Sequence, residues 1–233
     1  MTVGKVFNLV EDCDDFLVVN KLCPLDFHDD QGVSGLFNLV KDWYLNQNDT
    51  RSSDLYPLHR LDKLTTGLLL MAKNKTAAAT FGQMFERHQI QKFYLAISDG
   101  KPKKKQGWIK GDMAKARRGS YKLLRSMENP AITQFKSKAL DQGKRLFLLK
   151  PHSGKTHQLR VALKSVGAPI VGDPLYHHAD SNADRLYLHA WALQFTWQDK
   201  LYAFKADNPN GQYFDGSAFT EQLSNWDTPE TQF

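Results

Sequence analysis

The stretch richest in groups suited to chemistry is His59-Arg60-Leu61-Asp62, which Thr65-Thr66-Gly67 follow. A carboxylate such as Asp62 is able to act as a nucleophile or a proton acceptor, and a neighbouring arginine or histidine supplies hydrogen-bond donors. An isolated aspartate in such a turn more often accepts hydrogen bonds from the backbone N–H groups that follow it. Because a histidine, an arginine and an aspartate are crowded into this short segment, we favour a functional site.

A second polar segment is Gly154-Lys155-Thr156-His157-Gln158-Leu159-Arg160. Its residue types suit the first turn of a helix, and its simplest explanation is a capped surface helix in which His157 makes a local hydrogen bond. Arg160 also has a planar guanidinium that is able to pair bidentately with a carboxylate and keep it ionised.

We expect neither a metal nor a cofactor. No predicted strand runs into a glycine-rich phosphate loop, which argues against a nucleotide-binding domain. His152, His177 and His178 lack zinc-ligand spacing and are assigned to solvated loops. Cys13 and Cys23 are interpreted as reduced packing residues, because no histidine or cysteine stands near them at ligand spacing.

The net charge of +6 is concentrated in one segment. Ten basic residues and one acid lie between Lys101 and Arg125, whereas the rest of the chain holds 21 basic and 24 acidic residues. A lone lysine run is usually a solvated loop, but this segment also contains Trp108 and Tyr121, which favours contact with a polyanion. The candidate phosphate contacts are Lys103, Lys104, Lys105, Arg117 and Arg118.

The elements that must position these residues are mostly strands. Apolar runs predict strands at 16–20, 67–72 and 92–98, and hairpins at 131–139 with 144–150 and 185–197 with 201–206. Helices are predicted after Ser34, after Asn74, over 156–166 and near 219–226. Adjacent hairpins favour an α+β fold, with a largely antiparallel mixed sheet flanked by helices and loops. Phe and Trp residues on strands are assigned to the core.

The chain resembles the RluA-type pseudouridine synthases, a family that modifies ribosomal and transfer RNA. The segment from His59 to Gly67 resembles the catalytic motif of this family. Further blocks resemble the family in the same order: Lys92-Phe93-Tyr94-Leu95-Ala96, Gly154 to Arg160, Val171 to Tyr176, and Leu188-His189-Ala190. The similarity covers roughly Phe16 to Trp197, so the expected fold is the pseudouridine synthase catalytic fold.

The resemblance implies a role for several residues. Asp62 corresponds to the catalytic aspartate, and Arg160 to an arginine that forms an ion pair with it. Arg60 corresponds to the arginine that enters the RNA stack in place of the flipped uridine, and Tyr94 to a tyrosine against the flipped base. His59, Lys155 and His157 are expected to contact RNA as well. Whether the carboxylate attacks C1′ or abstracts the C2′ proton is left open.

The sequence departs from the family pattern after the first predicted strand. Lys21-Leu22-Cys23-Pro24 stands where Lys-Pro-x-Gly is usual, and Lys155 replaces an arginine. These changes indicate a divergent subgroup with altered RNA contacts.

We expect one catalytic domain over residues 1–210, with a basic insert at about 99–127 and a polar tail over 211–233. We expect no S4-type RNA-binding module, which many relatives carry, ahead of this domain. No apolar run is long enough to cross a membrane and no signal peptide is evident, so we expect a cytoplasmic monomer whose partner is ribosomal or transfer RNA.

Two other functions are compatible with parts of this pattern. The first is a catalytically silent RNA-binding or folding-assistance protein, which the basic segment would serve equally well. The second is a hydrolase that uses Asp62 with His59 or His157, but it lacks a serine or cysteine nucleophile and a metal set. Retention of Asp62, Tyr94 and Arg160 together favours the isomerase.

Overall fold

The computed structural model describes residues 3–46, 54–177, 182–207 and 209–233. The chain divides into two compact units, Met1–Ile90 with Ala190–Asp207, and Gln91–His189 with Asn208–Phe233. We describe each unit by itself. The predicted single domain over 1–210 and the predicted tail remain proposals, and the C-terminal residues belong to the second unit.

The first unit is built on antiparallel strands. Its strands are β1 (Phe7–Asp12), β2 (Phe16–Lys21), β3 (Tyr56–Pro57), β4 (Thr66–Ala72), β11 (Leu188–Trp197) and β12 (Lys200–Lys205). They are ordered β1-β2-β4-β11, with β12 paired to β11 and β3 paired to β4. Its helices are α1 (Val3–Val6), α2 (Leu36–Leu45) and α3 (Lys75–Glu86).

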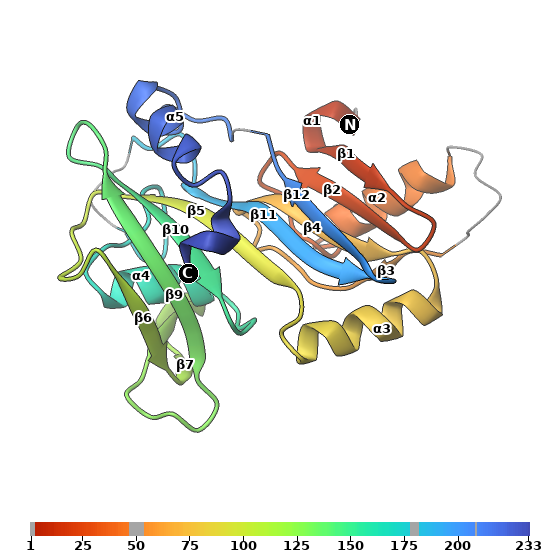
Figure 1. Ribbon diagram of the computed structural model, residues 1–233, viewed down its shortest axis with the longest axis horizontal. Coiled ribbons are helices and arrows are strands. Elements are labelled where there is room, and N and C mark those ends of the chain that lie inside the picture. The colour runs from red at the N-terminus through yellow and green to blue at the C-terminus, as the bar shows by residue number, and fades with distance from the viewer. Residues whose placement is uncertain (1–2, 47–53, 178–181, 208) are drawn as a thin grey trace. The chain divides into compact units, whose positions relative to one another are not determined.

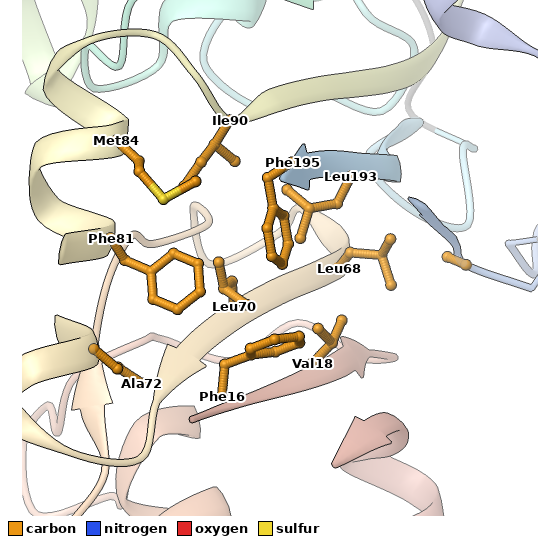
Figure 2. Close-up of a cluster of buried hydrophobic side chains, with 12 residues drawn as sticks. Phe16, Val18, Leu68, Leu70, Ala72, Phe81, Met84, Ile90, Leu193 and Phe195 are labelled. Atoms are coloured by element: carbon orange, nitrogen blue, oxygen red, sulfur yellow. The ribbon is translucent and has the colours of Figure 1, made fainter. Parts of the chain in front are cut away.

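A core of apolar side chains holds α3 against these strands (Figure 2). Phe16 of β2, Phe81 of α3 and Phe195 of β11 meet edge to face, with ring centroids 5.4 to 5.8 Å apart. Such pairs add to the stabilisation from apolar burial alone. The predicted start of α3 is confirmed, because the Asn74 side chain accepts a hydrogen bond from the Ala77 N–H at 2.8 Å.

The second unit carries β5 (Gln91–Ser98), β10 (Arg145–Pro151), β9 (Ala131–Ala139) and β6 (Gln106–Gly111), which lie side by side in that order (Figure 1). All three pairings are antiparallel. A separate hairpin joins β7 (Met113–Lys115) and β8 (Tyr121–Leu123) through the short helix η1 (Arg117–Gly119). The helices are α4 (Gln158–Ser165), α5 (Ser217–Ser224) and η2 (Pro229–Gln232).

The predicted α+β class with mostly antiparallel strands is confirmed, and two helix starts need correction. The residue before α2 is Gly35, and it makes no side-chain cap, so Ser34 is not the cap. Helix α4 begins at Gln158 because His157 has a left-handed backbone with φ of 58°. The strands β1, β3, β6, β7 and β8 were not predicted, because they are short or their residues alternate only weakly between apolar and polar.

Candidate active site

Asp62 opens a turn directly before β4. The Thr65 N–H donates to the main-chain carbonyl of Asp62 at 3.0 Å and closes the four-residue turn. The closing bond therefore does not use the carboxylate of Asp62, whose side chain is half-buried. Leu61, Thr65 and Thr66 on either side are buried, so the turn is anchored at both ends.

The side chain of Lys21, the last residue of β2, holds this turn in place. Its ammonium donates to the carbonyl oxygens of Asp62 at 3.1 Å and Lys63 at 2.6 Å. Lys21 is only 1% exposed, and this burial lowers its pKa to about 8, although Cys23, Asp26 and Asp62 nearby act in the opposite direction. Lys21 was predicted only as part of the divergent 21–24 segment, with no role in the site, and its signal was a lysine at the end of a mostly apolar strand.

The backbone at Gly67, which follows the two threonines, requires a glycine. Its φ is +113°, and a side chain there would begin 2.2 Å from the carbonyl oxygen of Ala190 in β11. Only glycine combines this backbone conformation with so close an approach of two main chains. The Thr65-Thr66-Gly67 sequence thus brings the strand after the turn tightly against its neighbour.

His59 and Arg60 precede the turn and have different environments. The Nε2 atom of His59 accepts a hydrogen bond from the Leu70 N–H at 3.0 Å, and its ring packs 5.2 Å from that of Phe85. Because Nε2 accepts this bond, it carries no proton there. Arg60 is exposed. The histidine therefore has a part in the fold that the sequence analysis did not foresee.

Tyr94 lies on β5 in the second unit. It is 8% exposed and pairs with Leu149 of β10 across the strands, in the same row as Phe135 of β9. Side chains that are paired in this way point to the same face of the sheet. That face is also covered by α4, because Gln158 donates from Nε2 to the Thr133 hydroxyl at 3.1 Å.

Arg160 makes a buried bidentate ion pair with Asp173. Its Nε and Nη2 atoms donate to the two carboxylate oxygens at 2.7 and 2.8 Å, and the side chains are 4% and 0% exposed. Asp173 also accepts from the N–H groups of Leu175 and Tyr176, at 2.9 and 3.1 Å. The predicted segments 154–160 and 171–176 are therefore joined, through an aspartate that the sequence analysis did not name as a site residue. The implied pairing of Arg160 with Asp62 stays a prediction.

A cluster around the Tyr176 hydroxyl connects α4 to the β7–β8 hairpin. His157 Nδ1 lies 3.0 Å from this hydroxyl, and the Tyr121 N–H donates to it at 2.8 Å. The Arg160 guanidinium and the Lys164 ammonium lie 5.0 and 5.5 Å from the centre of the Tyr176 ring. The hairpin that carries Arg117 and Arg118 is thereby anchored to the helix that carries Arg160.

The remaining predicted RNA contacts lie on the surface of the second unit. Lys103, Lys104, Lys105, Arg117 and Arg118 are exposed. The Lys155 ammonium donates to the Asn129 side chain at 2.7 Å. His177, which was assigned to a solvated loop, is instead buried and lies 3.0 Å from both carboxylate oxygens of Asp99. His178 lies outside the described residues.

The structure thus divides the predicted site between the two units. His59, Arg60 and Asp62 belong to the first unit, and Tyr94, Lys155, His157, Arg160 and the basic segment belong to the second. Within the described ranges, no three histidine, cysteine or acidic side chains are grouped so as to hold a metal. In the same ranges, no helix is long and apolar enough to span a membrane.

Comparison with known proteins defines the class of this chain. Residues 15–165 match the family described as RNA pseudouridylate synthase. A Haemophilus influenzae protein, described as an uncharacterized RNA pseudouridine synthase, is 44% identical over 209 residues, covering 90% of this chain and 91% of that protein. Ribosomal large subunit pseudouridine synthase C of Rickettsia bellii is 36% identical over 174 residues, covering 72% of this chain and 56% of that protein.

Two solved human structures share the fold. The protein called RNA pseudouridylate synthase domain containing 1 superposes with a TM-score of 0.73 at 24% identity, covering 98% of this chain and 97% of that one. The protein called RNA pseudouridylate synthase domain containing 4 gives a TM-score of 0.72 at 23% identity, covering 89% and 90%. The protein is thus an RNA-modifying isomerase that acts on uridine. It belongs to the RNA pseudouridylate synthase family and is of the RluA type.

Proposed function

We propose that Asp62 is the nucleophile with which this enzyme isomerises a specific uridine of ribosomal or transfer RNA to pseudouridine. The observation that carries the proposal is the Asp62 turn. Thr65 and Lys21 hold it through the main-chain oxygens of Asp62 and Lys63. A turn held in this way presents a carboxylate at a defined position, as a nucleophile requires.

The reaction moves one bond within the nucleotide. The bond between C1′ and N1 of uracil breaks, the base turns over, and C5 bonds to C1′. The C5 proton is then lost to solvent and N1 gains a proton. An ionised carboxylate is able to promote the first step by attack on C1′ or by removal of the C2′ proton. No group is imported and no electron is transferred, so the proposal needs no cofactor.

The target uridine must leave the RNA stack before it reaches the carboxylate. Base flipping costs a few kcal/mol and is helped by a side chain that fills the gap. We assign that task to Arg60, which is exposed beside the turn. Tyr94 is assigned to the flipped base, since an aromatic ring is able to hold a base while it rotates. Arg160 is assigned to pairing with Asp62, because a guanidinium keeps a neighbouring carboxylate ionised.

RNA binding is assigned to the basic surface of the second unit together with His59, Lys155 and His157. Phosphate contacts of this kind supply affinity and position, and they carry little sequence information. We further propose that the enzyme acts as a monomer in the cytoplasm, where its RNA substrates are made and assembled.

The test is tritium release from RNA labelled at uridine C5, with this protein and its Asp62→Asn variant. We expect release from the wild-type protein and a loss of at least about 1,000-fold in the variant. RNA binding should be largely kept, because asparagine has the same shape. Undiminished release by Asp62→Asn would remove Asp62 as the nucleophile.

The same samples separate the isomerase from its alternatives. A silent RNA-binding protein would bind RNA without releasing tritium from any RNA fraction. A hydrolase would shorten the RNA or release free uracil, whereas the isomerase leaves chain length unchanged. Deuterium at C2′ then distinguishes attack on C1′ from removal of the C2′ proton. Only the second route breaks the bond to that hydrogen, so only it predicts a markedly slower reaction.

A further inference from the structure

Trp108 is an exposed aromatic residue on a strand at the edge of its sheet. It lies on β6, which pairs only with β9 in the order of the sheet, and it is 51% exposed. Gln106 and Lys110 are exposed with it, whereas Ile109 between them is buried. Trp108 belongs to the basic segment that the sequence predicts to contact a polyanion, and its exposure leaves the ring accessible to a partner.

The surroundings of Trp108 are polar and positively charged. The Lys110 ammonium lies 4.7 Å from the centre of its ring, and the His152 ring lies 4.9 Å away at an angle of 36°. Gln134 of β9 is its direct partner across the strands. Strands β6 and β9 together contain Lys110, Lys136 and Lys138 but no acidic residue. We call Trp108, Lys110, Gln134, Lys136 and His152 the Trp108 surface.

This surface lies on the other face of the sheet from Tyr94. Tyr94, Leu149, Phe135 and Gly107 form one row of paired residues across β5, β10, β9 and β6. Trp108 follows Gly107 in sequence, and successive residues of a strand point to opposite faces. The Trp108 surface is thus separate from the face that carries Tyr94 and α4.

We propose that the Trp108 surface binds a single-stranded segment of the RNA substrate, with one base stacked on the Trp108 ring. This inference rests on the proposed function, which makes RNA the partner. A flat exposed ring bordered by lysines matches the two parts of a nucleotide, because the base stacks and its phosphates meet positive charge. Lys110 gives way readily, since an exposed cation–π contact is weaker than a stacked base.

The spacing suggests how one RNA reaches both faces. Trp108 lies three strands from Tyr94, or about 14 Å along the sheet at the usual strand separation. Because the Trp108 ring lies on the opposite face, an RNA strand that passes around the edge at β6 follows a longer route and needs several nucleotides to join the two places. The stacked base is therefore expected several nucleotides from the target uridine in the same single-stranded region.

The test compares Trp108→Ala with two controls in the full-length protein. Trp108→Phe keeps an aromatic ring, and Leu201→Ala removes an apolar side chain, 61% exposed, from the first unit. The probe is a labelled, uridine-rich, single-stranded RNA of about 12 nucleotides, comparable to the site of one single-strand-binding module, and a duplex of equal length is measured beside it. Fluorescence anisotropy reports the affinity of each variant.

We expect Trp108→Ala to weaken binding of the single strand about 10-fold, with a much smaller effect on the duplex, whose bases are already stacked. Trp108→Phe should retain most of the affinity, and Leu201→Ala all of it. Equal affinity of Trp108→Ala and wild type for the single strand would overturn the proposal. An equal loss for single strand and duplex would also overturn it, because phosphate contact alone predicts that result.

Failure of this inference is distinguishable from failure of the proposed function. Tritium release that needs Asp62, together with no effect of Trp108→Ala on binding, would leave the isomerase intact and remove only the Trp108 surface. Tritium release that does not need Asp62, together with weaker binding by Trp108→Ala, would remove Asp62 as the nucleophile and keep the Trp108 surface as an RNA contact.

Discussion

The Asp62 turn in the first unit and the α4 region in the second are held in place by different kinds of contact. The turn is fixed through main-chain oxygens, which accept hydrogen bonds from Lys21 and from the Thr65 N–H. The α4 region is fixed through side chains, with Arg160 bound to Asp173 and His157 near the Tyr176 hydroxyl. In both regions the groups that position the site are buried or half-buried.

The difference separates residues that act only in the reaction from residues that also stabilise the fold. A side chain that does not hold its own loop is open to substitution without loss of the fold. Thr65 and Lys21 bind main-chain oxygens of the Asp62 turn, which a change of the Asp62 side chain leaves in place, so such a change should act chiefly on chemistry. Arg160 joins two segments of the second unit, so a change there should act on stability as well. Variants in both regions measure that contrast.

Replacing Arg160 with methionine should destabilise the protein by about 3–5 kcal/mol. The substitution leaves Asp173 ionised and fully buried without its ion-pair partner. Arg160→Lys should lower the free energy of unfolding by less, because an ammonium keeps the charge although it does not form the bidentate ion pair. Urea unfolding measures both variants beside Asp62→Asn, for which we expect a clearly smaller loss, because Asp62 is half-buried whereas Arg160 and Asp173 are buried. Equal stability of Arg160→Met and wild type would contradict the structural role of the pair.

Replacing Lys21 with methionine should slow modification about 10- to 100-fold, because the turn loses both bonds that hold its carbonyls and the carboxylate is misplaced. RNA affinity should stay close to wild type, so single-turnover rates and binding are measured separately. Lys63→Met is the matched control. It removes a lysine of the same turn, whose bond to Asp26 is exposed, and should change little. A loss of affinity with an unchanged rate would contradict this positioning role.

The lowered pKa of Lys21 predicts that the free energy of unfolding depends on pH, and Lys21→Met tests this. The Lys21 pKa is about 8 in the folded protein, below its ordinary value of 10.5. Between these two pH values the unfolded chain binds more protons, so the Lys21 contribution to the free energy of unfolding rises with pH. Below about pH 8 both states are protonated and the contribution is constant. Lys21→Met should flatten the rise between pH 8 and 10, and an unchanged profile would show that another group causes it.

Removing the charges of Lys103, Lys104 and Lys105 should have the smallest effect, confined to the salt dependence of RNA binding. Each phosphate contact adds about 0.7 to the slope of log affinity against log salt for a single strand, so the slope should become shallower by up to about 2. A triple variant of Lys5, Lys75 and Lys200, which are exposed in the first unit, is the matched control. Equal slopes for the two variants would reduce the basic cluster to a solubilising loop.

The sequence alone determined the features that depend on neighbouring residues. The long apolar runs became β2, β4 and β5, and Asn74 caps α3 as predicted, because burial preference and capping act over a few residues. The order of the motifs also identified the family. The strands β6, β7 and β8 escaped prediction because their residues alternate only weakly between apolar and polar. The 51% exposure of Trp108 was likewise visible only in the structure.

Tertiary structure decided what holds the site residues in place. Lys21 reaches a turn 41 positions further along the chain, Arg160 a partner 13 positions away, and Tyr121 the hydroxyl of Tyr176 55 positions away. Such pairs leave no periodic signal, because each depends on where the folded chain brings two segments together. A lysine at a strand end is ordinarily solvated, and only the packing around β2 buries Lys21 and directs its ammonium to the carbonyls of the Asp62 turn.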